Sequence, residues 1–302
     1  MNFTKLSRKD AYWVDNATYF FNLFGFTISI CGIAFNILSF QTAKFLGKNN
    51  SAVVLIRLLA VWDTTAIVVD GILDLGGKCF NYDAANYFCS MFYFQNLSTN
   101  HVANFQLVLL VFDRFLAIRK PTWYSRSSHV QMAYTLSFAA FLFGYGVSLP
   151  ILFIFNTESG ICEMTGDPTF YYWYLRALVF GVYVTLPFLL ISFFNGFFIK
   201  FLLVHRKNFK SSEKMSQERA MVIMLATVSF TFLFFTAISG IFCIFVFQIA
   251  VEAVIDPSIL ALSNSVGQIP AILNSSLNFV FFYFSGKGYR IAFKSLILSY
   301  SC

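Results

Sequence analysis

The sequence has little charge and very little histidine. Asp, Glu, Lys and Arg make up 12% of its 302 residues, against about 25% in an average soluble domain. The three His and six Cys show no metal-ligand spacing and no pairing of a nucleophile with a base, so we expect neither a metal site nor an enzyme. Prolines are few, and there is no low-complexity tract and no repeat of solenoid period.

Apolar residues are abundant instead: 58% of the chain is hydrophobic and 20% is aromatic, with 41 Phe. A membrane-spanning helix needs about 20 mainly apolar residues. Seven segments meet this requirement: 19–43, 52–73, 88–112, 131–155, 172–203, 220–249 and 258–284. Since only helices and closed barrels satisfy their backbone hydrogen bonds in lipid, these runs predict an all-α membrane protein with a seven-transmembrane helix bundle.

The ends of the chain differ from this domain in composition. Residues 1–18 are polar and predict an N-terminal tail without a cleaved signal sequence, because the first apolar run is long enough to span. Residues 19–284 form the predicted membrane domain. In residues 285–302, Tyr289 and Phe293 recur at helical spacing among basic residues. This pattern predicts a short amphipathic eighth helix on the membrane surface.

The basic residues predict how the chain is oriented. Most of the 21 Lys and Arg residues lie in one set of connections and in the C-terminal segment, and cytoplasmic loops carry such an excess. We therefore expect a multi-pass protein of the plasma membrane with its N-terminus extracellular and its C-terminus cytoplasmic. Asn2 and Asn16 begin acceptor sequons in the tail and are expected to be glycosylated.

The third apolar segment closes with the adjacent acid and base Asp113 and Arg114, followed by Phe115. Ionisable groups at that depth are costly and usually functional. The run resembles the Asp-Arg-Tyr motif of rhodopsin-like G-protein-coupled receptors, with Phe115 in place of the Tyr. The resemblance implies a receptor that activates a heterotrimeric G protein through Asp113, Arg114, Ile118 and Pro121.

Polar residues inside the other segments match further positions of that family. Asp63, in the sequence Leu-Ala-Val-Trp-Asp, resembles the family's carboxylate of the second helix, and Asn36, Asn274 and Asn278 resemble polar positions of the first and seventh helices. A lone carboxylate in hydrocarbon must be paired or protonated. The four residues predict a polar network that holds water or a sodium ion near Asp63, or a hydrogen-bond cluster that is purely structural.

Cys89 precedes Arg114 by 25 residues, and Cys162 lies between the fourth and fifth segments. The resemblance implies that these two cysteines form a disulfide, which pins the intervening loop over a binding pocket. Cys79, in the preceding loop, is an alternative partner.

Several family positions carry other residues. Thr236 and Ile238 stand where the sixth helix of the family has Trp and Pro, and Phe279 and Phe282 stand where the seventh has Pro and Tyr. A helix that lacks its proline keeps its backbone hydrogen bonds and should be straighter. Because of these departures, the sequence does not decide whether the sixth and seventh helices take part in activation as they do in the family.

The ligand class is narrowed by exclusion. No Lys lies in 258–284 to bind retinal, and Asn96 stands where aminergic receptors carry Asp. Asp63, Asp70 and Asp74 share one helix face at about 100° per residue. We expect Asp70 and Asp74 to pair with a cationic ligand, although Asp70 could instead pair internally with Lys78 or Arg176 or face water in the loop. Further polar contacts are expected from Asn96, Asn100 and Gln268.

The pattern as a whole resembles invertebrate neuropeptide receptors of the FMRFamide type. It implies that an extracellular ligand, most simply a cationic amidated peptide, acts on the bundle, with membrane lipids and a G protein as partners and no nucleic acid. A chemosensory receptor for small molecules is an alternative. A seven-helix transporter or channel is a more distant one, because only Asp63 lies deep and no internal repeat is present.

Overall fold

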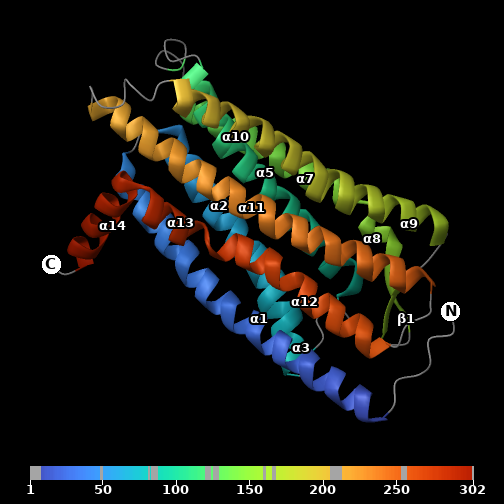
Figure 1. Ribbon diagram of the computed structural model, residues 1–302. Coiled ribbons are helices and arrows are strands. Elements are labelled where there is room, and N and C mark those ends of the chain that lie inside the picture. Colours follow the sequence, from blue (N-terminus) through green and yellow to red (C-terminus); the bar gives the residue numbers. More distant parts are fainter. Residues whose placement is uncertain are drawn as a thin grey trace.

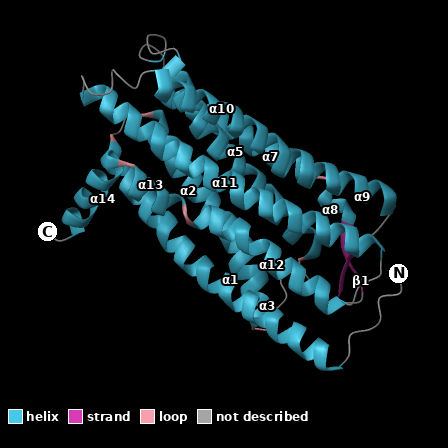
Figure 2. Cartoon of the chain, in the orientation of Figure 1, coloured by secondary structure: helices cyan, strands magenta, loops and turns pink. Residues whose placement is uncertain are grey.

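The computed structural model of the chain describes residues 8–47, 50–80, 82, 88–119, 124, 129–158, 161–164, 168–204, 213–252 and 257–300. Long helices lie side by side in an elongated bundle (Figure 1). A short hairpin lies at the end of the bundle nearest the N-terminus and is magenta in Figure 2. We call this end the hairpin end and the opposite one, where the chain finishes, the C-terminal end.

The helices follow one another along the chain with few other elements between them. In order they are α1 (Arg8–Ala43), η1 (Lys44–Leu46), α2 (Ser51–Ile67), η2 (Val68–Gly76), α3 (Gly77–Cys79), α5 (Cys89–Arg119), α7 (His129–Ser148), α8 (Ile151–Ile154), α9 (Pro168–Arg176), η3 (Ala177–Thr185), α10 (Leu186–Val204), α11 (Glu213–Glu252), α12 (Pro257–Ser276), α13 (Asn278–Ser285) and α14 (Lys287–Tyr300). The strands β1 (Phe155–Glu158) and β2 (Ile161–Met164) pair antiparallel, with Asn156 opposite Glu163.

Six of the described helical segments are long and apolar enough to cross a membrane: Asp10–Leu46, Ser51–Cys79, Cys89–Arg119, His129–Ile154, Trp173–Phe201 and Ile223–Phe242. The seventh expected span, 258–284, is occupied by α12 and α13, which pack between α1 and α11. The predicted all-α membrane bundle is confirmed. The chain is a multi-pass membrane protein whose seventh segment is two helices rather than one.

Burial separates the central helices from the peripheral ones. In the most apolar stretches of Ser51–Cys79 and Cys89–Arg119, 61% of the residues are buried, against 28% in Asp10–Leu46. The exposed residues of the peripheral helices include large apolar side chains such as Phe153 and Phe234. Such a surface suits contact with lipid tails rather than with water. The α2 and α5 helices therefore form the centre to which functional polar groups can be fixed.

The helix boundaries differ from the predicted ones at the N-terminus. The first helix begins at Arg8, so the part of the expected tail that is described is helical. Asn16 lies on this helix with its amide donating to the carbonyl of Tyr12 at 2.7 Å. Asn2, the other predicted glycosylation site, lies outside the described residues.

Two segments, η2 and η3, are π-helical rather than α-helical. In η3, the N–H of Leu186 donates to the carbonyl of Gly181, five residues back. Pro187 follows directly and lacks an N–H, so the turn before it is free to widen. The seventh segment is interrupted at Leu277, where a bend separates α12 from α13.

The last helix confirms the predicted amphipathic segment. The α14 helix leaves the bundle at the C-terminal end (Figure 1) with Tyr289, Ala292 and Leu296 buried and Ile297 exposed. The Tyr289 hydroxyl donates to Ser39 Oγ of α1 at 3.0 Å, and burial raises the pKa of this phenol above its usual value. The contact fixes the angle at which α14 leaves the bundle.

Small residues set the distance between α1 and α12. A Cβ at Gly32 would collide with the Ser276 side chain and would lie 3.0 Å from Ile67 Cδ1. Ser276 is itself buried and donates to the Ile272 carbonyl at 2.6 Å. The two helices therefore approach as closely as their backbones and one hydroxymethyl group allow.

We predict that Gly32→Ala lowers the stability of the purified protein by about 1–3 kcal/mol, because overpacking forces α1 away from α12. A thermal unfolding curve in detergent measures this, and adding Ser276→Gly should restore most of the loss. Gly146→Ala on α7 is the matched control, since its Cβ would meet nothing within 4 Å. Equal stability of the Gly32→Ala and Gly146→Ala proteins would contradict the prediction.

Candidate functional site

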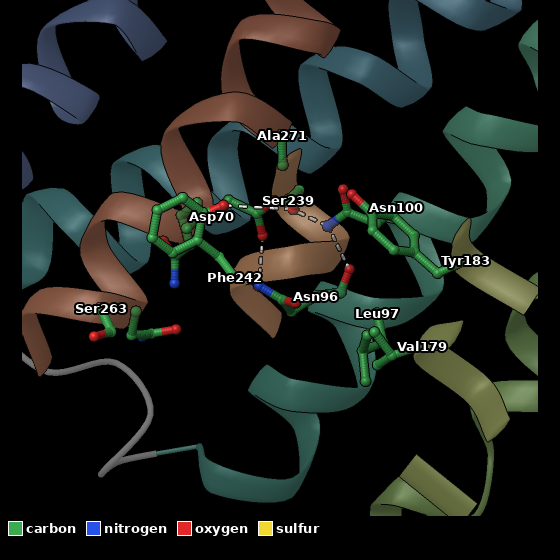
Figure 3. Close-up of a pocket in the computed structure, with 13 residues that line it drawn as sticks. Asp70, Asn96, Leu97, Asn100, Val179, Tyr183, Ser239, Phe242, Ser263 and Ala271 are labelled. Carbon is green, nitrogen blue, oxygen red and sulfur yellow. Dashed lines mark hydrogen bonds between the residues drawn. The ribbon is translucent and has the colours of Figure 1, made fainter. Parts of the chain in front are cut away.

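A cavity of about 200 Å³ opens in the hairpin-end half of the bundle, among η2, α5, η3, α11 and α12. Figure 3 shows its polar residues turned toward one another from different helices. Asp70 comes from η2, Asn96 and Asn100 come from successive turns of α5, and Gln268 comes from α12. These are four of the five residues that the sequence indicated as ligand contacts.

Asp70 is the charged residue of this cavity and is 5% exposed. Its carboxylate accepts a hydrogen bond from Asn96 Nδ2 and a second, of 2.9 Å, from Asn100 Nδ2. Within the described part of the chain no Lys or Arg forms an ion pair with it. The internal pairing with Lys78 or Arg176 that the sequence left open is therefore not made. Neutral amides, and no cation among the described residues, therefore hold the Asp70 carboxyl group.

Asp74, the fifth expected contact, is not among the residues that line the cavity. Its carboxylate forms an ion pair with Lys78 Nζ at 2.8 Å and accepts from Gln268 Nε2 at 2.6 Å. The two carboxylates thus differ in charge balance, although they lie four residues apart on one helix. Lys78 neutralises Asp74 and leaves Asp70 for another partner.

The cavity also contains residues that the sequence did not indicate. Tyr183 of η3 and Ser239 and Phe242 of α11 line it. In a chain with 41 Phe and 15 Tyr, a single aromatic residue gives no signal of its own. Their place in the wall depends on how η3 and α11 pack against α5.

The predicted polar network lies deeper in the bundle. Asp63 is 3% exposed and accepts from Asn278 Nδ2 at 2.7 Å. Asn36 donates to the Ser275 carbonyl at 3.1 Å, and its own Oδ1 is buried without a hydrogen-bond partner among the described residues. Asn274 is half-buried one turn before Asn278. Oxygen atoms from α1 and α2 therefore meet the break between α12 and α13.

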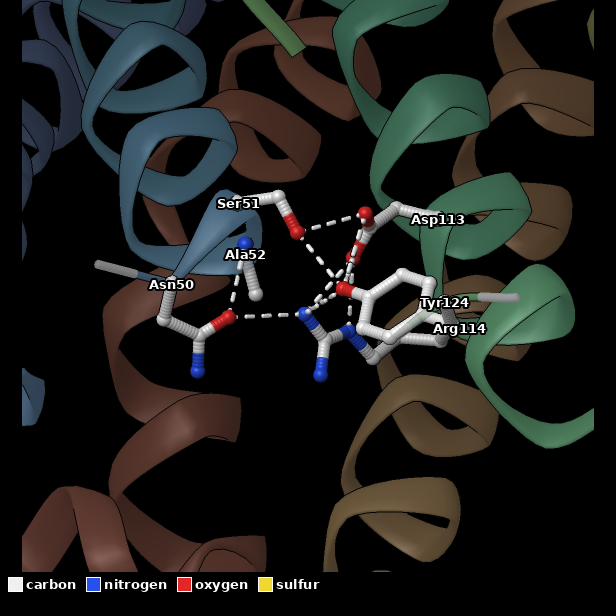
Figure 4. Close-up of polar contacts among 6 residues, drawn as sticks. All are labelled: Asn50, Ser51, Ala52, Asp113, Arg114 and Tyr124. Atoms are coloured by element: carbon white, nitrogen blue, oxygen red, sulfur yellow. Dashed lines mark hydrogen bonds and ion pairs between the residues drawn. The ribbon is translucent and has the colours of Figure 1, made fainter. Parts of the chain in front are cut away.

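At the C-terminal end, Arg114 is held in a cluster with four other residues, Asn50, Ser51, Asp113 and Tyr124 (Figure 4). Arg114 is 7% exposed and forms an ion pair with Asp113 at 2.6 Å. Arg114 Nη2 donates to Asn50 Oδ1 at 2.9 Å and to the Tyr124 hydroxyl at 3.2 Å. We call these five residues the Arg114 cluster.

Tyr124 and Ser51 complete the bonding of Asp113. The Tyr124 hydroxyl donates to both carboxylate oxygens, at 3.1 and 3.2 Å, and Ser51 donates to one at 2.6 Å. Burial raises the pKa of the Tyr124 phenol, so the hydroxyl keeps its proton. Asn50 caps α2, since its Oδ1 also accepts from the Ala52 N–H at 3.0 Å. The cluster therefore joins the end of α5 to the start of α2.

The sequence indicated Asp113 and Arg114 but none of the other three members of this cluster. Asn50 before an apolar run is an N-cap signal, yet nothing in the sequence pairs it with Arg114. Of the other predicted coupling residues, Ile118 is half-buried on α5. Pro121 lies outside the described residues.

The hairpin is tied to α5 by a disulfide between Cys89 and Cys162, whose Cα atoms are 5.4 Å apart. The predicted connectivity is confirmed, and Cys79 is a free thiol. Ser90 adds a hydrogen bond from its hydroxyl to the Phe155 carbonyl of β1. The hairpin is therefore anchored at the start of the helix that also carries Asn96 and Asn100.

The chain matches one protein-family model, described as 7 transmembrane receptor (rhodopsin family), over residues 37–280. The matched region includes the cavity, the Arg114 cluster and all of the polar network except Asn36, which precedes it by one residue. No curated protein matches the chain with significant similarity.

Proposed function

The chain belongs to the rhodopsin family of seven-transmembrane receptors, and on this premise we propose that it binds a cationic, amidated neuropeptide in the Asp70 cavity. Members of this family are receptors rather than enzymes and signal through heterotrimeric G proteins. The observation that supports the ligand class is the Asp70 carboxylate, buried in the cavity wall and bonded to neutral amides.

A buried carboxylate without a cation is unfavourable, because burial removes its water without supplying an opposite charge. A ligand Arg or Lys would supply that charge, and charge-assisted hydrogen bonds to a carboxylate are about twice as strong as neutral ones. Asn96 and Asn100 already hold the carboxylate in one position. The ligand cation thus meets a fixed acceptor.

The size of the cavity limits what enters it. Pockets for small molecules are typically about 300–1,000 Å³, and this cavity is about 200 Å³. One cationic side chain or terminal group fits such a volume, and the rest of a peptide would extend toward the hairpin end. The sequence has acidic residues between the second and third and between the fourth and fifth apolar segments, and in this proposal they steer a cation inward: Asp83, Glu158, Glu163 and Asp167.

A second candidate ligand follows from the same small volume. A small organic cation would fill the cavity without needing contacts outside it, as in a chemosensory receptor. Tyr183 and Phe242 in the wall suit an ammonium group, because aromatic faces attract cations. The two candidates differ in whether binding depends on parts of the ligand other than its cationic group.

We assign the hairpin end to the extracellular side of the plasma membrane and the C-terminal end to the cytoplasm. The basic connections and α14, with Lys287, Arg290 and Lys294, support this assignment. The Arg114 cluster then faces the G protein. In this proposal the ligand favours an open state in which Arg114 leaves Asp113 and contacts the G protein beside Ile118 and Pro121.

The polar network suits a sodium ion, which coordinates oxygen ligands. Asp63 offers a carboxylate oxygen that Asn278 does not occupy, and Asn36 Oδ1 is buried and unpaired among the described residues. We propose that these two oxygens hold the ion. Its charge would balance Asp63 in the closed state.

We predict that Asp70→Asn lowers peptide potency by about 30-fold or more, since truncating one partner of a buried charged pair costs about 2–5 kcal/mol. The measurement is G-protein activation in cells screened with amidated neuropeptides. Asp15→Asn, an exposed position on α1, is the matched control. Unchanged potency of Asp70→Asn at equal surface expression would refute the ligand assignment.

We predict that Tyr124→Phe raises basal G-protein activation about 3- to 10-fold. The change removes the hydroxyl that bridges Asp113, Ser51 and Arg114 while keeping the ring, and each hydrogen bond contributes about 0.5–1.5 kcal/mol. Tyr134→Phe, at an exposed position on α7, controls for loss of a hydroxyl. Basal signalling equal to wild type would show that the cluster does not restrain Arg114.

We predict that Na⁺ raises the Tm of the purified receptor relative to choline at equal ionic strength. Binding at ten times Kd stabilises by about 1.4 kcal/mol. Asp63→Asn should remove the difference between the two salts. A sodium effect that survives this substitution would place the ion elsewhere.

A further inference from the structure

Two cations lie beside the ring of Phe40, near the end of α1. The guanidinium carbon of Arg57 on α2 is 4.4 Å from the centroid of this ring, and Nζ of Lys44 on η1 is 5.6 Å from it. The η1 segment packs against α14, which places these residues at the C-terminal end of the bundle. An aromatic face attracts cations but carries no net charge. The ring therefore positions the two side chains without neutralising either one.

No acid of the described part of the chain forms an ion pair with Lys44 or Arg57. Arg57 is half-buried, and its Nε is a buried donor without a hydrogen-bond partner among the described residues. It lies six residues after the start of α2, which is about 9 Å along the helix axis. A cation at such a depth in a membrane helix is costly unless an anion pairs with it. The site thus combines an excess of positive charge with an unused donor.

The surface next to this site is apolar and suits contact with lipid tails. Ile37, three residues before Phe40 on α1, is 53% exposed, and Val61, four residues after Arg57 on α2, is 44% exposed. Residues three or four apart lie on the same side of a helix. Because α1 and α2 run in opposite directions, Ile37 and Val61 both lie deeper in the bundle than the two cations. A lipid whose tails cover these residues would therefore have its headgroup beside Arg57.

We propose that Lys44, Phe40 and Arg57 form a binding site for the headgroup phosphate of an anionic phospholipid. The guanidinium group donates to phosphate oxygens in a planar geometry that fits them, and the ammonium group adds a second charge. Phe40 is a positioning residue, because it acts by holding Arg57. A zwitterionic lipid fits less well, since its own cation leaves the positive charge of the site in excess. The site is separate from the ligand cavity, and only its assignment to the cytoplasmic leaflet rests on the orientation proposed above.

The test is a thermal-shift titration of the purified full-length receptor in detergent, without ligand or G protein, with three probes. Phosphatidylglycerol and phosphatidylcholine with the same acyl chains differ in net charge, and glycerol 3-phosphate has the phosphate but no chains. For wild type we expect phosphatidylglycerol to reach half-saturation at a concentration about 5- to 30-fold lower than phosphatidylcholine, a factor of about 5 for each cation. Glycerol 3-phosphate should not raise the Tm, because it cannot cover the apolar surface beside the site.

Three variants test the site by different routes. Arg57→Gln and Lys44→Gln each remove one charge and should lower the preference for phosphatidylglycerol about 5-fold. Phe40→Leu keeps both charges but removes the ring that positions them, so the preference should also fall. Lys294→Gln, at an exposed position on α14, is the matched control, because it removes the same charge at the same end of the bundle. If Arg57→Gln does not fold, Lys44→Gln still decides the question, since Lys44 is exposed.

Each other outcome overturns the proposal in a different way. Equal half-saturation of wild type by the two lipids would show that the site does not select an anion. A loss of preference in Lys294→Gln as large as in Arg57→Gln would show a diffuse attraction to basic residues rather than a site. Stabilisation by glycerol 3-phosphate equal to that by phosphatidylglycerol would assign the site to a free anion. Because the assay contains no ligand and no G protein, none of these results bears on the proposed function.

Discussion

Burial of three carboxylates on one helix is the constraint on which the arrangement of this bundle depends. Asp63, Asp70 and Asp74 are each less than 10% exposed, and a carboxylate cannot remain buried without hydrogen-bond donors. Asn278 of α13 supplies a donor to the first, Asn96 and Asn100 of α5 supply donors to the second, and Lys78 and Gln268 supply donors to the third. The second segment is thereby tied to the third and seventh segments at three depths.

The same helices connect the two ends of the receptor. The α5 helix carries Asn96 and Asn100 beside the cavity, and it carries Asp113 and Arg114 at its other end. The second segment likewise joins Asp70 to Ser51, which bonds Asp113. In the proposed mechanism, a ligand that moves Asp70 or α5 would alter the Arg114 cluster through these two helices. Such coupling requires that the cavity and the Arg114 cluster both shift the equilibrium between the same two states of the bundle.

The residues that depart from family positions change where the helices bend. The seventh segment lacks a proline at Phe279, yet it is interrupted at Leu277, one residue before Asn278. Pro270, about two turns earlier within α12, has no backbone N–H to donate. In the fifth segment the turn before Pro187 is a π-helix. Among the described residues, the π-helix of the fifth segment lies beside the cavity and the break in the seventh segment lies beside Asp63.

The sequence by itself determined the fold class and the second, third and seventh segments as the source of polar groups. The disulfide partners were implied by the family resemblance, and only the structure excluded Cys79 as a partner. Length and apolarity decide a membrane helix almost alone, since the lipid leaves the backbone no other partner, and Asp70, Arg114 and Asn278 stand out because ionic and amide groups are rare in such runs. Only the tertiary structure decided that Asp70 forms no ion pair among the described residues, because a possible partner such as Arg176 lies on another segment and its distance from Asp70 depends on packing. It also placed Asn50, Ser51 and Tyr124 around Arg114. These facts depend on distances between helices, which follow from packing at positions such as Gly32 and not from any periodicity along the chain.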